Sequence, residues 1–196
     1  MGPMGPMGRM GHMGPIRPIG PIRPMTPAIA MTTSLYPPTI IVRHTHENPR
    51  KCSVFPLKGR PDVIFLNYPV TQRPPLGGYV RLAAEGPELS AADVGAGLLL
   101  LDGSWRWAAS MTRDFADVPP RSLHGWRTAY PRTSKLGTDP DNGLASVEAL
   151  VAAYHILGRP LDGLLDHYRW ADEFLRLNNL PSFAAPLPQP PSHPAT

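Results

Sequence analysis

The stretch LLLLDGSWRWAASM runs from Leu98 to Met111 and decides the fold class. Its leucine run (97–101 with Gly97) is apolar on both faces, which is typical of a strand in the middle of a parallel sheet covered by helices. The run stops at Asp102, and the segment 104–115 then reads as a helix. The carboxylate is either a helix N-cap, with Ser104 as the rival cap, or part of a ligand site at the strand end.

Strands and helices alternate on both sides of this stretch. Short apolar runs predict strands at 39–44, 62–69 and 97–101, extended structure at 77–83, and one more strand within 121–131. The intervening residues predict helices at 47–57, 89–95, 104–115, 146–158 and 161–179, the last as one helix or two. Asn48, Ser90 and Ser146 are the expected N-caps, Pro49 takes the first helical position, and Gly158 ends its helix. This order predicts an α/β fold with a mainly parallel sheet flanked by helices.

Two low-complexity tails flank the predicted domain. Residues 1–31 repeat Gly, Pro and Met without an acid or an aromatic ring, so they are predicted to be a disordered tail. The alternative is a true start at a later methionine such as Met31. Residues 181–196 are a second, Pro-rich tail predicted to be disordered. One domain remains, 32–180, with an N-terminal part 32–115 and a C-terminal part 116–180.

The positive charge is unevenly distributed. Arg9, Arg17 and Arg23 in the first tail carry three of the four net charges, so the basic pI says little about the domain. Basic side chains nevertheless gather near the start of the domain: Arg43, Arg50, Lys51 and Lys58. They predict either a patch that binds the phosphates of RNA or an ordinary solvated face.

The sequence argues against several other classes. Cys52 is the only cysteine, which rules out an intrachain disulfide and fits a reducing compartment. No run approaches the roughly 18 apolar residues that span a membrane, so we expect a soluble, cytoplasmic protein. His44 and His46 share a strand face but have no further ligands nearby, so no metal site is expected. GxGxxG, Walker, GxSxG and HExxH patterns are all missing.

Asp102 and Trp105 point to one kind of ligand. A carboxylate beside a flat aromatic ring suits a ligand that is cationic and partly planar, such as a sulfonium joined to adenine. Ser53 and Ser146 stand near the starts of predicted helices, where free amides can bind a carboxylate. The simpler interpretation makes Ser53 an ordinary small residue and Ser146 a cap.

Segments of the chain resemble a known family, the small-subunit ribosomal RNA aminocarboxypropyltransferases. NPRKCSVFPL (48–57) is similar to their DPKKCTGKKL, and LLLLDGSW (98–105) to their Asp-x-Ser-Trp strand end. GLASVEALVAAYHILG (143–158) resembles their KLSCVEALAAALYILG, and YRWADEFLRLNN (168–179) their closing segment. The matches occur in family order and span 47–179. DGSWRWAASM (102–111) is also similar to the DTW-domain tRNA-uridine aminocarboxypropyltransferases.

The resemblance implies a SPOUT-class α/β fold with a trefoil-knotted cofactor pocket. It implies S-adenosylmethionine as cofactor, and transfer of its 3-amino-3-carboxypropyl group to a ring nitrogen of a uridine-type base in RNA. Asp102 would lie near the sulfonium and help to deprotonate the base, while Trp105 packs on the cofactor. Ser53 and Ser146 would hold the cofactor's carboxylate.

Further positions follow from the same resemblance. Leu66, Leu144 and Ala149 would surround the adenine, and Arg50 and Lys51 would bind RNA. The chain departs from the family at 54–56, where Val-Phe-Pro replaces Gly-Lys-Lys, and in a longer, acidic loop at 131–143. From the resemblance as a whole, we expect modification of ribosomal RNA during ribosome biogenesis. The alternatives are a tRNA uridine as acceptor, methyl transfer in the same pocket, and a non-catalytic RNA-binding assembly factor.

Overall fold

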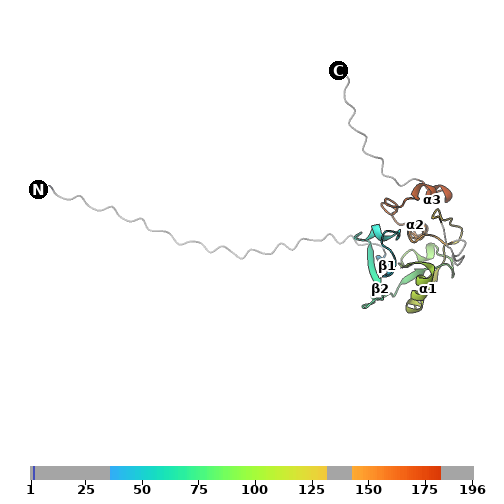
Figure 1. The fold of residues 1–196 in the computed structure, drawn as a ribbon, viewed down its shortest axis with the longest axis horizontal. Helices are drawn as coiled ribbons and strands as arrows, with labels where there is room; N and C mark the ends of the chain where they lie inside the picture. Colours follow the sequence, from blue (N-terminus) through green and yellow to red (C-terminus); the bar gives the residue numbers. More distant parts are fainter. Residues whose placement is uncertain (1, 3–35, 132–142, 182–196) are drawn as a thin grey trace, which may run out of the picture. The chain divides into compact units, whose positions relative to one another are not determined.

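The computed structural model describes residues 2, 36–131 and 143–181. The chain divides into the units Met1–Thr33 and Ser34–Thr196 (Figure 1). The predicted tail 1–31 lies outside the described residues except for Gly2, as does 181–196 except for Pro181.

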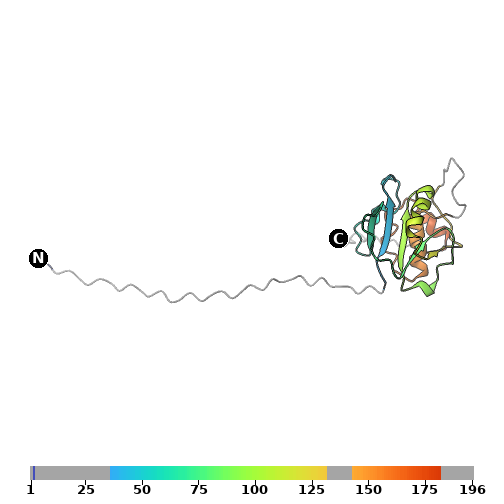
Figure 2. The same cartoon turned by 90° about the horizontal axis from the view of Figure 1, so that it is seen from below.

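Five strands form one sheet in which every pair is parallel, in the order β2-β1-β4-β3-β5. The strands are β1 (Thr39–His44), β2 (Val63–Tyr68), β3 (Tyr79–Leu82), β4 (Gly97–Asp102) and β5 (Pro120–Arg121). Figure 2 shows β1 and β2 running side by side. The prediction of an α/β fold with a mainly parallel sheet is confirmed. Because the strands are parallel, their carboxyl ends meet at one edge, where Arg43 pairs with Asp102 in register.

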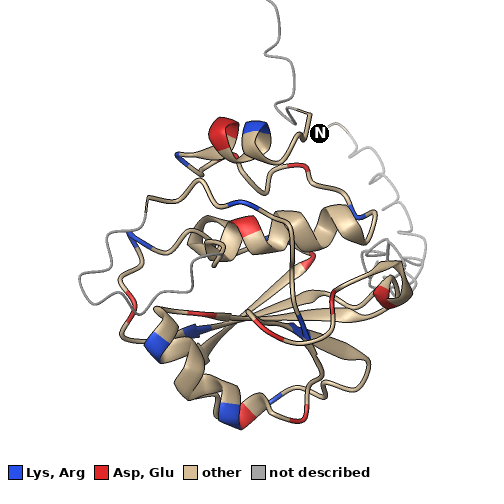
Figure 3. Ribbon diagram, turned by 90° about the vertical axis from the view of Figure 1, so that its right-hand side faces the viewer, with Lys and Arg blue, Asp and Glu red and all other residues tan. Residues whose placement is uncertain are grey.

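Helices cover both faces of the sheet (Figure 3). One face packs against α1 (Trp105–Thr112) and the following 3-10 turn η3 (Arg113–Phe115), the other against α2 (Ser146–Ile156) and α3 (Ala171–Leu177). Leu98 and Leu100 join the α2 cluster, while Leu99 and Leu101 join the α1 cluster. Each strand turns successive side chains to opposite faces, which explains why β4 is apolar throughout.

The predicted helix at 47–57 is wrong. The segment forms turns, followed by the 3-10 helix η1 (Phe55–Leu57). Asn48 does not cap a helix but accepts a hydrogen bond from the Arg50 amide at 2.9 Å, which closes a local turn. Pro56 lacks an amide hydrogen, so an α-helix could not continue through it without a gap in its hydrogen bonding.

The other elements follow the predictions with three differences. The strand expected within 121–131 is reduced to β5, which ends at Arg121. The helix expected at 161–179 is only α3, since the preceding residues are turns with Gly163 at φ 72°. Ser146 begins α2 but does not cap it, because Ala145 occupies the N-cap position. Ser90 does cap its 3-10 turn, η2 (Ala91–Asp93), as expected.

The described residues also bear on two other classes of protein, those that span membranes and those that bind metals. No helix among them has the length and apolar character needed to cross a membrane. Nor does any group of three or more His, Cys, Asp or Glu side chains within 36–131 and 143–181 come together as a metal site would require.

Candidate functional site

Asp102 is the last residue of β4, the middle strand, and its side chain is buried with 5% exposed. The alternation along β4 places it on the α2 face, with Leu98 and Leu100. Its Oδ2 accepts a hydrogen bond of 2.9 Å from the thiol of Cys52. It is not the N-cap of α1, since that position belongs to Ser104, whose side chain makes no capping bond. The acid therefore lies at the strand end, inside the molecule.

Cys52 is a hydrogen-bond donor rather than a nucleophile. Burial raises the pKa of its thiol to about 12, and the charge of Asp102 and the hydrogen bond to it add to the effect. A thiolate is the reactive form of cysteine, so this thiol stays protonated and unreactive at neutral pH. Its function in the site is to hold one oxygen of Asp102.

Ser53 links the same segment to α2. Its Oγ accepts a hydrogen bond from the Val147 amide at 3.2 Å, at the first turn of the helix. The hydroxyl thus binds one of the amides that a helix N-terminus leaves without a partner. Two adjacent residues, Cys52 and Ser53, therefore connect the end of β4 with the start of α2.

Glu148 organises the walls next to this junction, a role that was not predicted from the sequence. Its carboxylate is fully buried, at 0% exposed. Oε1 accepts hydrogen bonds from the Ala129 amide (2.8 Å) and the Tyr168 hydroxyl (2.9 Å). Oε2 accepts from the Thr128 hydroxyl (2.6 Å) and the Ala145 amide (2.8 Å). The one carboxylate joins the 128–130 segment, the start of α2 and the segment before α3.

A pocket of about 490 Å³ opens between these segments. One wall comes from the turn after β1 and the other from the segments that Glu148 holds. Its lining residues are Pro49, Arg50, Lys51, Cys52, Ser53, Pro56, Tyr130, His167, Arg169 and Trp170. Tyr130 meets Trp170 edge-on, with ring centroids 5.0 Å apart at 72°. The volume falls in the range of small-molecule and cofactor sites.

The structure separates the predicted adenine contacts. Leu144 and Ala149 are half-buried and pack against the α2-side cluster, as a common pocket would require. Leu66 packs against the α1-side cluster, on the opposite face of the sheet. Trp105 is half-buried at the first position of α1, and Ser146 is half-buried at the first position of α2.

The predicted basic patch is also only partly exposed. Arg50, Lys51 and Lys58 are exposed, and the first two line the pocket. Arg43 is buried with 7% exposed, donates to the Glu47 carbonyl oxygen, and stacks 5.6 Å from the Phe55 ring centre. Because Arg43 stands inside the β1 strand, its side chain is a structural element rather than an exposed contact for RNA.

A second group of residues braces the junction from β4 to α1. His44 stacks on Trp107 with centroids 4.1 Å apart at 14°, and its pKa is lowered by burial and by His46, against an opposing effect of Glu47. Glu47 accepts a hydrogen bond of 2.6 Å from the Ser104 amide. The chain thus folds back tightly just after Asp102. The two histidines were predicted from the sequence only as possible metal ligands, and this stack was not predicted.

Fold and site together define an α/β protein whose pocket lies at the carboxyl edge of a parallel sheet, beside a buried acid. No protein-family model and no curated protein matches the chain. Among solved structures, it is similar to the SAM-dependent rRNA:acp-transferase Tsr3 from Vulcanisaeta distributa, with 22% sequence identity and a TM-score of 0.55. The match covers 72% of this chain and 79% of that one. The two proteins share their fold.

Proposed function

We propose that the chain is an S-adenosylmethionine-dependent RNA aminocarboxypropyltransferase whose acceptor is a uridine-type base of small-subunit ribosomal RNA. One observation carries the proposal: the family-like segments, far apart in sequence, meet at one site. Hydrogen bonds join Cys52 to Asp102, Ser53 to the Val147 amide, and Tyr168 to Glu148. The similarity of fold to an rRNA:acp-transferase supports the same conclusion.

The residues at the junction fit the charges of the cofactor. Asp102 provides a buried carboxylate for the positive sulfonium, and burial strengthens that attraction. The start of α2, with Ser53 and Ser146 beside it, suits the cofactor's carboxylate. Trp105, Leu144 and Ala149 are the proposed apolar contacts, and Leu66 is left out because it belongs to the other face.

Bound S-adenosylmethionine supplies an aminocarboxypropyl carbon activated by a positively charged sulfur. In the transfer, the bond between that carbon and sulfur breaks, a bond to the base nitrogen forms, and methylthioadenosine leaves. The imide proton of the base must also leave, and we assign Asp102 as the group that accepts it. The thiol of Cys52 keeps this carboxylate oriented by its 2.9 Å hydrogen bond to Oδ2.

Several finer features belong to the proposal through the sequence resemblance. These are a SPOUT-type trefoil knot, a role in ribosome biogenesis and a cytoplasmic location. Most of the longer, acidic loop noted in the sequence, residues 132–142, lies outside the described residues. A tRNA uridine as acceptor, methyl transfer and a non-catalytic assembly factor remain the alternatives that the experiment must separate.

The test uses the full chain, total RNA from the source organism, and S-adenosylmethionine labelled separately in the methyl and carboxyl groups. Carboxyl label in small-subunit ribosomal RNA, without methyl label, is the expected result. Label in tRNA would change the acceptor, and methyl label alone would mean a methyltransferase. A chain that binds the cofactor but labels nothing would favour an assembly factor. Asp102→Asn keeps a hydrogen-bond acceptor for Cys52 and should nevertheless abolish transfer.

A further inference from the structure

The pocket beside Asp102 has a charge opposite to the one that the cofactor needs. Three of its lining residues are Arg50, Lys51 and Arg169, and its described lining contains no acid. All three are exposed, and none forms an ion pair with another described residue. S-adenosylmethionine carries two positive charges and one negative charge at neutral pH. Such a pocket repels a net cation and attracts a polyanion.

The wall of the pocket is aromatic as well as basic. Trp170 is half-buried, meets Tyr130 edge-on, and packs 5.7 Å from Tyr168. The guanidinium of Arg169 lies 5.8 Å from the Trp170 ring centre. Single-stranded RNA is recognised by this combination, in which bases stack on rings and cationic side chains bind the backbone.

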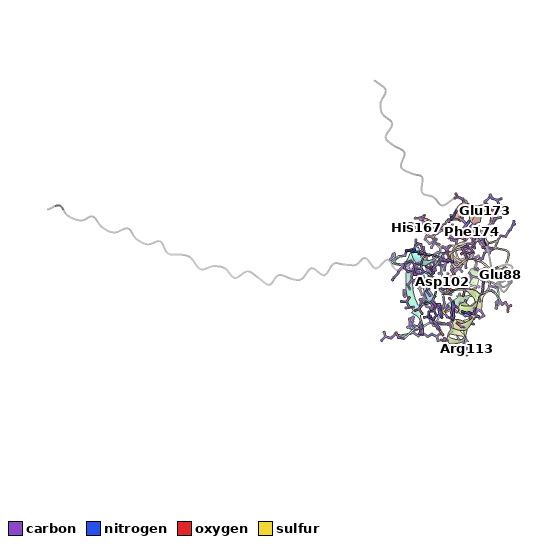
Figure 4. All side chains as sticks on the ribbon, viewed as in Figure 1. Glu88, Asp102, Arg113, His167, Glu173 and Phe174 are labelled. Atoms are coloured by element: carbon purple, nitrogen blue, oxygen red, sulfur yellow. The ribbon has the colours of Figure 1, made fainter. Side chains whose placement is uncertain are left out.

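The pocket also adjoins the proposed reaction centre. Cys52 and Ser53 line it, and Cys52 is in direct contact with Asp102. Glu148 fixes the segments that carry Tyr130 and Trp170, so the aromatic wall is held in place before any ligand arrives. In Figure 4, His167, another lining residue, and Arg113 lie on opposite sides of Asp102.

We propose that this pocket binds the acceptor nucleotide of the RNA, with its base against Trp170 and Tyr130 and its phosphates on Arg50, Lys51 and Arg169. The assignment rests on the proposed function, and it places RNA and cofactor on two sides of the Cys52–Ser53 segment. His167 and Arg169, from the segment before α3, thereby join the RNA-binding residues, which were predicted from the sequence only within 43–58.

The experiment measures binding of a fluorescent, uridine-rich single-stranded RNA to the full chain without cofactor, over a series of salt concentrations. Arg169→Gln should weaken binding and reduce the slope of log affinity against log salt by about 0.7, the value for one phosphate contact. Arg113→Gln is the matched control, since Arg113 is exposed, carries the same charge and lies across the sheet. It should leave affinity and slope unchanged.

Trp170→Leu tests the aromatic wall. It should lower RNA affinity roughly fivefold to hundredfold with an unchanged salt slope, as loss of one stacked base does. If this variant does not fold, Arg169→Gln decides, because its exposed side chain contributes little to the core. The assignment would be overturned if Arg169→Gln bound RNA with the affinity and the salt slope of the wild type. It would also be overturned if the wild type bound no RNA.

A parallel titration with S-adenosylmethionine separates the two proposals. Arg169→Gln should bind the cofactor as the wild type does. A loss of cofactor affinity that matches its loss of RNA affinity would mean that the pocket belongs to the cofactor, and would overturn the inference. A wild-type chain that binds RNA through Arg169 but never binds S-adenosylmethionine would instead contradict the proposed function while supporting the pocket.

Discussion

Replacing Glu148 by glutamine should destabilise the domain far more than its small change in shape suggests. The carboxylate accepts from two amides, of Ala129 and Ala145, and from two hydroxyls, of Thr128 and Tyr168. A glutamine amide has one oxygen, so its NH2 group must face one amide and one hydroxyl. The hydroxyl can rotate and accept a hydrogen bond, but the amide N–H cannot.

The magnitude follows from that count. A buried hydrogen bond to a charged group contributes about 1.5–3 kcal/mol, and an unsatisfied buried donor costs about 1–3 kcal/mol. We expect Glu148→Gln to lower the free energy of unfolding by about 3 kcal/mol. For a domain of this size each kcal/mol shifts the melting temperature by about 2–4 °C, so the expected fall is about 6–12 °C.

Thermal and urea unfolding followed by circular dichroism measure the effect. Glu173→Gln is the matched control, because Glu173 in α3 is exposed and bonds only Arg176 at 2.6 Å among the contacts found in the described chain. It should change the melting temperature little. A Glu148→Gln domain within about 0.5 kcal/mol of the wild type, the range of surface substitutions, would refute the reasoning.

The remaining predictions probe other contacts. Asp102→Asn removes the negative charge beside Cys52, so it should lower the pKa of that thiol from about 12 and speed its alkylation by iodoacetamide at pH 8 by about tenfold or more; equal rates would contradict the electrostatic effect of Asp102 on the thiol. The lowered pKa of His44 means that the unfolded chain takes up a proton first on acidification, so stability should fall as the pH drops below about 6.5. His44→Gln should flatten that fall in urea titrations, and an unchanged slope would count against it. Gly97→Ala places a Cβ 2.4 Å from the Tyr79 ring and should cost about 1–3 kcal/mol in urea unfolding; a neutral result would show that the ring moves freely.

Much of the fold is readable from the sequence because single elements are strongly patterned. The leucines of β4 and the apolar spacing of α2 predicted those elements. Gly158, which follows the C-cap of α2 with φ 63°, stops the helix as expected. The position of Asp102 at the carboxyl end of a buried strand followed from the same pattern. These features depend on residues close together in the chain, so one sequence is enough to predict them.

The remaining features of the fold and the site depend on which residues face each other across the structure. No local sequence pattern encodes these long-range contacts. Phe65 and Leu66 are both apolar neighbours in β2, so nothing in the sequence tells which of them faces α2. Arg43 counts as one more basic residue until β1 is seen to bury it. Glu148 resembles any acid in a first helical turn, because its partners at 128, 129 and 168 come from distant segments.

The pair Cys52 and Ser53 has a consequence for how the protein is made. Cys52 forms a hydrogen bond with Asp102, 50 positions later in the chain, and Ser53 forms one with Val147, 94 positions later. During synthesis the five strands are complete once Arg121 has emerged, yet the second bond has no partner until Val147 follows. A nascent or truncated chain that stops before that residue has every strand of the sheet but lacks the junction, so the completed carboxyl-terminal part decides when the site exists.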